Sequence, residues 1–176
     1  SAIYGEYKQL DKAILYGKKA LKLAHKIDDF FGVTEDTRVL GKYYFLQKNY
    51  TQAELYYKKA ISLKTNLFDQ EGMAFVYSQI AELYANKPAT GIEKEHNLLM
   101  ALNYGLKANQ IAEKLKIPIL TSDVSRNLSE IYKKMNNYPK AFKYLEINKK
   151  TNDSIFNKSK AEALTFTEAR WNNEKK

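Results

Sequence analysis

Apolar residues recur every three or four positions along most of this chain, a spacing that places them on one face of an α-helix. Stretches with this period are separated by short polar runs such as QKNY at 47–50 and MNNY at 135–138, which favour turns. A further polar run, 151–154, offers N-cap residues for a last helix. The pattern predicts helical segments at 1–7, 10–29, 33–47, 50–66, 70–86, 95–116, 119–135, 138–150 and 154–174.

The same residue spacing occurs four times along the chain. A tyrosine is followed by an alanine and, seven positions later, by a second small residue, and the first alanines are 40, 48 and 40 positions apart. The second small residue is replaced by Asn148 in the last copy, and a small residue stands three positions before each later tyrosine. The copies are Tyr4, Ala13, Ala20; Tyr44, Ala53, Ala60; Tyr84, Ala101, Ala108; and Tyr132, Ala141, Asn148.

This spacing predicts a stack of helix hairpins. The small residue and the tyrosine lie on one face of the first helix, and the two alanines form a stripe on the second helix that lets a neighbour approach closely. Each hairpin buries its apolar face only against the next hairpin. We expect an all-α fold in which Tyr44, Tyr84 and Tyr132 are core residues.

The repeated unit resembles the tetratricopeptide repeat, which has a small residue, a tyrosine, an alanine, an aromatic residue and an alanine in this order. Residues 40–60 match closely, through Gly41, Tyr44, Ala53, Tyr57 and Ala60. The resemblance implies a right-handed α-α superhelix of about four hairpins, followed by a C-terminal helix. It places a solenoid at 1–150, with a clipped first unit and an insertion at 86–93, and a capping or linker helix at 151–176.

The formal net charge of +9 raises the question of nucleic-acid binding. Only Arg38, Arg126 and Arg170 are arginines, and the remaining cations are lysines distributed over the whole chain. Arginine is the residue suited to bidentate phosphate and base contacts, whereas lysine is a hydrated point charge. We therefore interpret the lysines as solvated helix faces and expect no nucleic-acid partner.

Candidate catalytic chemistry is sparse. The chain has no cysteine, and its two histidines, His25 and His96, lack the spacing of metal ligands. No phosphate-binding glycine loop, nucleophile elbow or dinucleotide fingerprint occurs. We expect a protein that is not an enzyme and that needs neither cofactor nor metal.

In tetratricopeptide-repeat proteins the first helix of each unit lines a concave groove. The resemblance implies a protein or peptide ligand in this groove. A subclass of the family clamps a C-terminal carboxylate, but Lys42, Gln79 and Asp123 stand where that clamp has Asn, Asn and Lys. Carrying over the groove positions gives the candidate binding residues Arg38, Lys42, Phe45, Phe75, Ser78, Glu82, Arg126 and Glu130.

The segment after the repeats resembles the long helix of transmembrane signalling proteins of Bacteroides-like bacteria, through the run from Asn152 to Phe156 and the Lys/Glu/Ala-rich residues after it. This resemblance implies an extracytoplasmic sensor domain of an inner-membrane histidine kinase or helix-turn-helix regulator, acting by ligand binding or as a homodimer. The fragment itself would make no membrane contact. The alternatives are a cytoplasmic scaffold or adaptor and, more remotely, an RNA-associated repeat protein.

Overall fold

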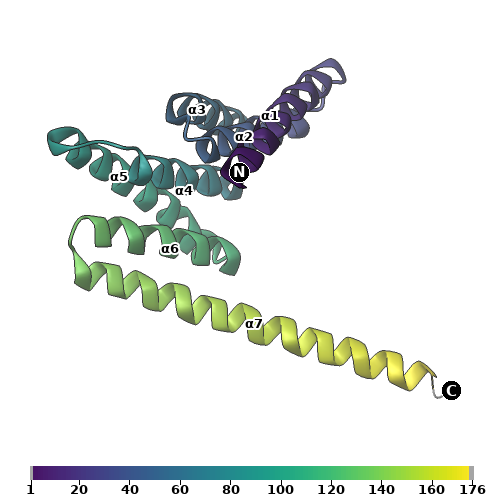
Figure 1. The fold of residues 1–176 in the computed structure, drawn as a ribbon. Helices are drawn as coiled ribbons and strands as arrows, with labels where there is room; N and C mark the ends of the chain where they lie inside the picture. The colour runs from purple at the N-terminus through teal and green to yellow at the C-terminus, as the bar shows by residue number, and fades with distance from the viewer. Residues whose placement is uncertain (1, 175–176) are drawn as a thin grey trace.

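The structure, a computed structural model, describes the backbone of residues 2–174 and the side chains of 9–166, 168 and 170. No strand occurs among these residues, which confirms the all-α fold class (Figure 1). The helices are α1 (Ala2–Lys26), α2 (Phe30–Leu46), α3 (Tyr50–Asn66), α4 (Gln70–Asn86), α5 (Gly91–Leu115), α6 (Pro118–Lys134) and α7 (Tyr138–Glu174).

The helices form three hairpins, α2/α3, α4/α5 and α6/α7, with α1 packed against α2 at the N-terminal end. Helix α4 also contacts both α2 and α6, whereas α1, α3, α5 and α7 make no contacts with one another within the described chain. We call α2, α4 and α6 the inner helices and the other four the outer helices. Because the inner helices of successive units contact one another whereas the outer helices do not, the stack curves around the inner helices, and the fold is an all-α repeat superhelix.

In the hairpins α2/α3 and α4/α5 and at Tyr132 and Ala141, the residues that mark the repeat in the sequence form the core of the stack, whereas Ala20 of α1 is exposed. Ala53 and Ala60 of α3 and Ala101 and Ala108 of α5 have no exposed surface. Tyr44, Tyr84 and Tyr132 are buried as predicted, with 6 to 8% of each exposed. Because alanine side chains are short, they allow the adjacent helices to approach closely.

Most of the turns between helices have the same backbone conformation. Asp28, Lys48, Phe68, Lys116 and Asn136 have positive φ angles of 54 to 61°, each ending a helix in the left-handed conformation. In four of these turns the next residue is the N-cap of the following helix: the side chains of Asp29, Asn49, Asp69 and Asn137 accept a hydrogen bond from the backbone N–H three positions on. Such a cap typically stabilises a helix by about 1 kcal/mol.

The predicted separate helices at 1–7 and 10–29 are wrong, because α1 is continuous from Ala2 to Lys26. The residues between Tyr4 and Ala13 contain no polar turn comparable with 47–50. The spacing of Tyr4 therefore imitates the repeat within a single helix, and the first unit contributes only an outer helix.

Two other predicted boundaries also moved. Helix α5 begins at Gly91 rather than near 95, so most of the insertion at 86–93 leads into an extended α5 and only 87–90 lie outside helices. The predicted break at 151–154 is absent: Thr151 donates to the Ile147 carbonyl at 2.8 Å and stays within the helix. The division of the chain at 150/151 into solenoid and linker remains a prediction.

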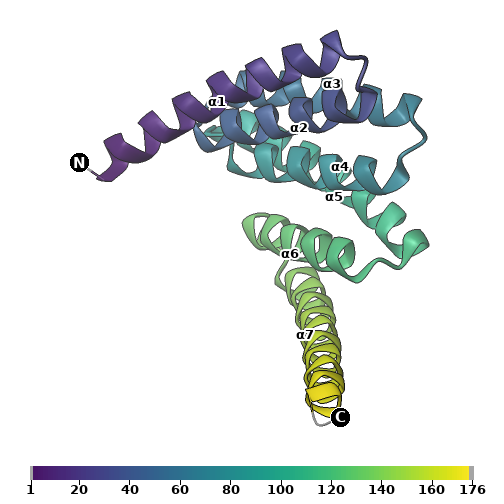
Figure 2. The same ribbon diagram turned by 90° about the vertical axis from the view of Figure 1, so that its right-hand side faces the viewer.

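Helix α7 extends well beyond the helix it packs against (Figures 1 and 2). Its first half lies along α6, and every described side chain after Ile155 is exposed. No helix between residues 2 and 174 is both long and apolar enough to cross a membrane.

Candidate functional site

A groove with a volume of about 610 Å³ lies on the inner helices. Helix α2 contributes Arg38 and Lys42, and α4 contributes Phe75, so the groove collects three of the residues predicted from the sequence. Asp123 of α6 lies on its far side. The remaining lining residues are Phe31, Glu35, Lys64, Asp69, Glu71, Gly72 and Gln79.

One end of the groove is fixed by a buried lysine. Lys64, with 4% of its side chain exposed, donates to Glu35 of α2 at 2.5 Å and to Asp69, the N-cap of α4, at 2.8 Å. Glu35 also pairs with Arg38 at 3.0 Å, and Phe31 lies 5.7 Å from the Lys64 ammonium. This network ties α2, α3 and α4 together where their ends meet.

The charges of the network hold one another ionised. Burial by itself would raise the pKa of Glu35 and Asp69, but the hydrogen bonds from Lys64 outweigh it, and both pKa values lie below the ordinary range. Burial would likewise lower the pKa of Lys64, but its bonds to Asp69 and Glu35 raise it. Because the charges at this end of the groove are already paired with one another, they stabilise the packing of α2, α3 and α4.

The charged residues in the middle of the inner helices do not take part in the ion-pair network of Lys64. Glu82 of α4 is half-buried, and burial, opposed by the positive charges of Arg126 and Lys42, raises its pKa. Lys42 is exposed and makes no ion pair in the described chain. Arg126 donates to Asp123 at 2.6 Å, both on α6. Of these charged groups, Lys42 and Glu82 thus form no ion pair in the described chain, whereas Arg126 does.

Gln79 of α4 is the least satisfied polar group in the groove. Its Oε1 atom is buried and has no hydrogen-bond partner among the described residues. A buried acceptor without a donor costs about 1–3 kcal/mol, so such an atom calls for an explanation. A donor from a bound molecule, such as a peptide N–H, would supply the missing hydrogen bond.

Five predicted residues do not line the groove: Glu82 and Arg126, which are described above, and Ser78, Phe45 and Glu130. Ser78 is 1% exposed and accepts a hydrogen bond from the Asn127 amide at 2.7 Å. Phe45 is half-buried and meets the edge of Tyr50 with ring centroids 6.0 Å apart. Glu130 is exposed on α6, outside the lining residues. Ser78 and Phe45 thus serve packing in this structure.

The sequence reasoning missed Gln79 in the middle of α4, and it missed the residues that come from outside the middle of the inner helices. Lys64 belongs to an outer helix and Asp69 to a turn, whereas the groove positions were taken from the first helix of each unit. Glu35 lies three positions before Arg38, so the face of α2 that presents Arg38 contained a signal for it. No comparable local signal pointed to Lys64.

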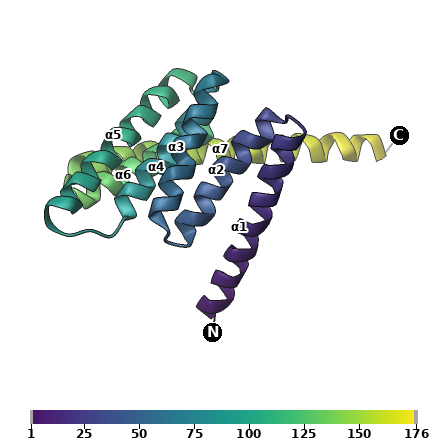
Figure 3. The same ribbon diagram turned by 90° about the horizontal axis from the view of Figure 1, so that it is seen from above.

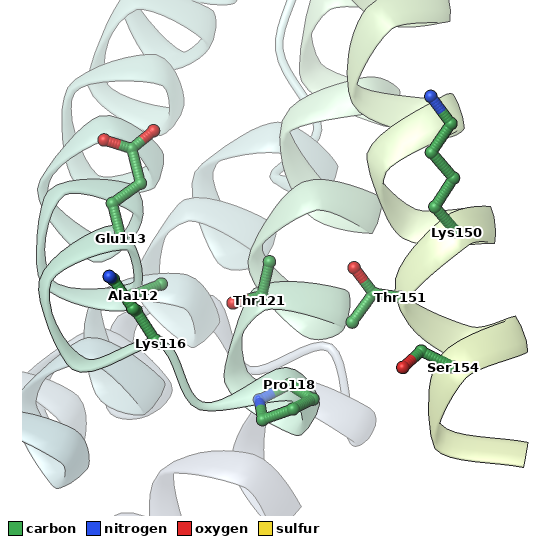
Figure 4. Close-up of a pocket in the computed structure, with 8 residues that line it drawn as sticks. All are labelled: Ala112, Glu113, Lys116, Pro118, Thr121, Lys150, Thr151 and Ser154. Atoms are coloured by element: carbon green, nitrogen blue, oxygen red, sulfur yellow. The ribbon is translucent and has the colours of Figure 1, made fainter. Parts of the chain in front are cut away.

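A second hollow, of about 400 Å³, lies where the end of α5 and the start of α6 meet the middle of α7 (Figure 4). Glu113 and Lys116 stand on one side and Lys150 on the other. The hydroxyls of Thr121 and Thr151 already donate to backbone carbonyls in their own helices. The hollow contains none of the predicted site residues and no unsatisfied buried group, so the candidate site is the inner groove.

Within the described residues, no cluster of three or more acidic or histidine side chains could hold a metal ion. The site is therefore defined by its shape, its ion pairs and the unsatisfied Gln79.

No family model matches the chain, and a search of curated proteins finds no relative. Among solved structures, the fold is similar to BtubC (BKLC) from P. vanneervenii, a TPR-like all-helical protein, with a TM-score of 0.69 and 20% identity. The match covers 88% of this chain and 61% of the BtubC chain. At this identity the likeness establishes the helical-repeat fold and carries no statement about the ligand.

Proposed function

We propose that this chain is a non-catalytic interaction domain that binds a peptide or protein segment in the inner groove. The observation that carries the proposal is the buried Oε1 of Gln79, an acceptor without a donor. It lies in a groove that also presents Lys42 and the aromatic ring of Phe75. Backbone N–H groups, charges and apolar side chains are what a peptide offers to such a surface.

The charge of the groove narrows the class of ligand. Its lining contains four carboxylates, Glu35, Asp69, Glu71 and Asp123, against three cations, although the whole chain has 29 basic and 20 acidic residues. The groove is thus acidic relative to the rest of the surface. A segment with basic and apolar side chains fits it better than an acidic one.

A peptide display selection tests this proposal. Random peptides are selected on the protein, and the enriched sequences are measured against Gln79→Leu, which removes the unsatisfied acceptor at similar volume. We expect binding to weaken about fivefold, since one net hydrogen bond is worth about 1 kcal/mol, with folding intact. Gln110→Leu, an exposed glutamine on α5, is the matched control and should bind normally.

A charge variant gives a second readout. Lys42→Glu should change which peptides are enriched toward more basic sequences, whereas Lys143→Glu on α7, also exposed, should not. If every enriched peptide bound both glutamine variants and both lysine variants equally, the inner groove would not be the binding site.

We further propose that the domain is the extracytoplasmic sensor of a membrane-anchored bacterial signalling protein. The support is the continuity of α7, which runs from the last hairpin into a protruding helix that can transmit a change at the groove. Reading the gene beyond Lys176 tests this: about 20 consecutive apolar residues are expected. A stop codon there would favour the cytoplasmic scaffold, and binding of RNA at low salt would favour the RNA-associated alternative.

A further inference from the structure

The turn between α3 and α4 holds an exposed phenylalanine in a conformation that suits other residue types. Phe68 has a φ angle of 54°, in the left-handed region where bulky side chains are rare and Asn, Asp and Gly are favoured. Its side chain is also 88% exposed. Among the described residues, the other non-glycine positions with positive φ are all polar: Asp28, Lys48, Lys116 and Asn136. The backbone of the turn therefore gives no reason for a phenylalanine here.

Local packing does not account for Phe68 either. A hydrophobic residue just before an N-cap often packs against the fourth residue of the following helix. Here the N-cap is Asp69 and the fourth residue of α4 is Met73, but the exposed ring is not covered by it. The turn lies in the middle of the stack, with the turns α1/α2 and α5/α6 at the same end of the helices (Figures 2 and 3). Neighbouring turns are thus present on both sides and leave the ring open to solvent.

The inner groove reaches this end of the stack. Its lining residues in α2 lie within 31–42 and those in α4 within 71–79. Phe31 and Glu71 are the second residues of their helices, so the groove extends from the middle of the inner helices to their first turn. Phe68 comes three positions before Glu71. It therefore stands just beyond the end of the groove.

A second exposed ring, Phe31 of α2, lies at the same end. Phe31 is 69% exposed, and its ring centroid is 5.7 Å from the ammonium of Lys64. Lys64 also donates at 2.8 Å to Asp69, the residue directly after Phe68. Lys64 thus joins the start of α2 to the turn that carries Phe68. We call Phe31 and Phe68 the aromatic edge of the groove.

The aromatic edge and the groove together define the chemistry of a ligand that covers both. Aromatic side chains are enriched among the residues that carry binding energy at interfaces, because a partner that covers them removes apolar surface from water. The adjacent groove has four carboxylates against three cations, so it favours basic side chains. A ligand that uses both surfaces combines a large apolar side chain with basic residues.

The length of the groove sets the spacing within such a ligand. Glu71 and Gln79 are eight residues apart on α4, which corresponds to about 12 Å along a helix axis. An extended peptide advances about 3.3 Å per residue. About four or five residues of an extended peptide therefore separate the aromatic edge from Gln79.

On the basis of the function proposed above for the inner groove, we propose that its ligand is a peptide segment with a large apolar residue packed on Phe31 and Phe68. This residue lies about four or five positions from the donor that bonds to Gln79, and basic residues stand between the two. Phe68 is then a binding residue, which accounts for a phenylalanine in a left-handed turn.

The variant Phe68→Asn separates binding from stability. Asparagine tolerates the left-handed conformation better than phenylalanine, so the variant should unfold at a urea concentration no lower than that of the parent. Its affinity for the peptides selected by display should nevertheless fall about tenfold, because an apolar contact is lost. Lys48→Asn places asparagine at the positive φ of the turn α2/α3, at the other end of the helices, and should bind normally. Phe142→Ala, which removes an exposed ring of α7, should also bind normally.

The selected peptides provide the second half of the test. They should share a large apolar residue, and replacing it with alanine should weaken binding to the parent about tenfold. The same replacement should have little further effect on binding to Phe68→Asn, because the contact is already lost. Fully additive effects would show that the two side chains do not touch, and would overturn the proposal.

The variant Gln79→Leu distinguishes a failure of this proposal from a failure of the groove as the binding site. If Gln79→Leu weakened binding and Phe68→Asn did not, the groove would be the site and the aromatic edge would not belong to it. If Phe68→Asn weakened binding and Gln79→Leu did not, the ligand would bind outside the groove and both proposals would be wrong. Unchanged binding in both variants would likewise overturn both.

Discussion

Gly41 shows how one residue controls the approach of two helices. A Cβ at this position would lie 2.6 and 2.7 Å from the Cδ1 and Cε1 atoms of Tyr57, whose side chain is only 1% exposed. The other two inner helices have Ala81 and Ser129 here, and their outer helices have Gly105 and Leu145 in place of Tyr57. Gly41, the smallest residue at its position in the three hairpins, thus faces Tyr57, the largest residue at the opposing position.

Gly41→Ala should therefore destabilise the protein, even though alanine is the better helix former by about 0.5–1 kcal/mol. Overpacking against a buried ring typically costs about 1–3 kcal/mol, so we expect a net loss of about 1–2 kcal/mol in urea unfolding. The double variant Gly41→Ala/Tyr57→Leu should show a favourable coupling energy. An alanine variant as stable as the parent would mean that the ring has room to move.

At the scale of elements, Lys64 determines how two units join. It is an outer-helix residue whose ammonium bonds to α2 and to the start of α4, so it fixes the relative position of three helices at one end of the groove. The two carboxylates are 30% and 32% exposed. Solvent therefore reaches the carboxylates of the network but hardly reaches Lys64.

Lys64→Met should cost about 1–3 kcal/mol at neutral pH, less than the loss of a fully buried pair because its carboxylates are partly solvated. The depressed pKa values of Glu35 and Asp69 mean that their contribution is present above the unfolded pKa and is lost as pH falls through the folded pKa. The raised pKa of Lys64 keeps its contribution intact until strongly alkaline pH.

The stability difference between parent and variant should therefore be largest near neutral pH and shrink below about pH 4, where the carboxylates become protonated. Denaturant unfolding at a series of pH values measures this. Lys58→Met, which breaks an exposed pair with Glu54 on the same helix, is the control and should have a small effect. A pH-independent deficit would show that Lys64 acts through packing alone.

At the scale of the whole molecule, stability should be graded along the stack, because each helix contacts only its neighbours. Helix α4 contacts α2, α3, α5 and α6, whereas α7 beyond Ile155 has only exposed described side chains. The groove lies next to the best-supported helix, so its geometry is held by the most stable part of the fold.

Hydrogen exchange of the dilute protein should show this gradient. We expect the slowest exchange in α4, intermediate rates in α2 and α6, and fast exchange in 156–166, where no neighbouring helix protects the backbone. Uniform protection along the whole of α7 under dilute conditions would contradict this picture.

The sequence by itself determined the hairpins, because helical period and alanine spacing are local and repeat at every unit. It identified the tyrosine core and placed Arg38, Lys42 and Phe75 in the groove. It misplaced the boundary at 1–10, where the repeat spacing occurs within one continuous helix, and the boundary at 151–154, where polar residues that often end helices are accommodated within α7. Only the tertiary structure determines that Lys64 forms ion pairs at the end of the groove and that Ser78 accepts a hydrogen bond from Asn127. It also determines that the Oε1 atom of Gln79 has no hydrogen-bond donor among the described residues. The first two outcomes depend on contacts between residues 29 and 49 positions apart, and the third depends on burial by several helices, neither of which local periodicity encodes.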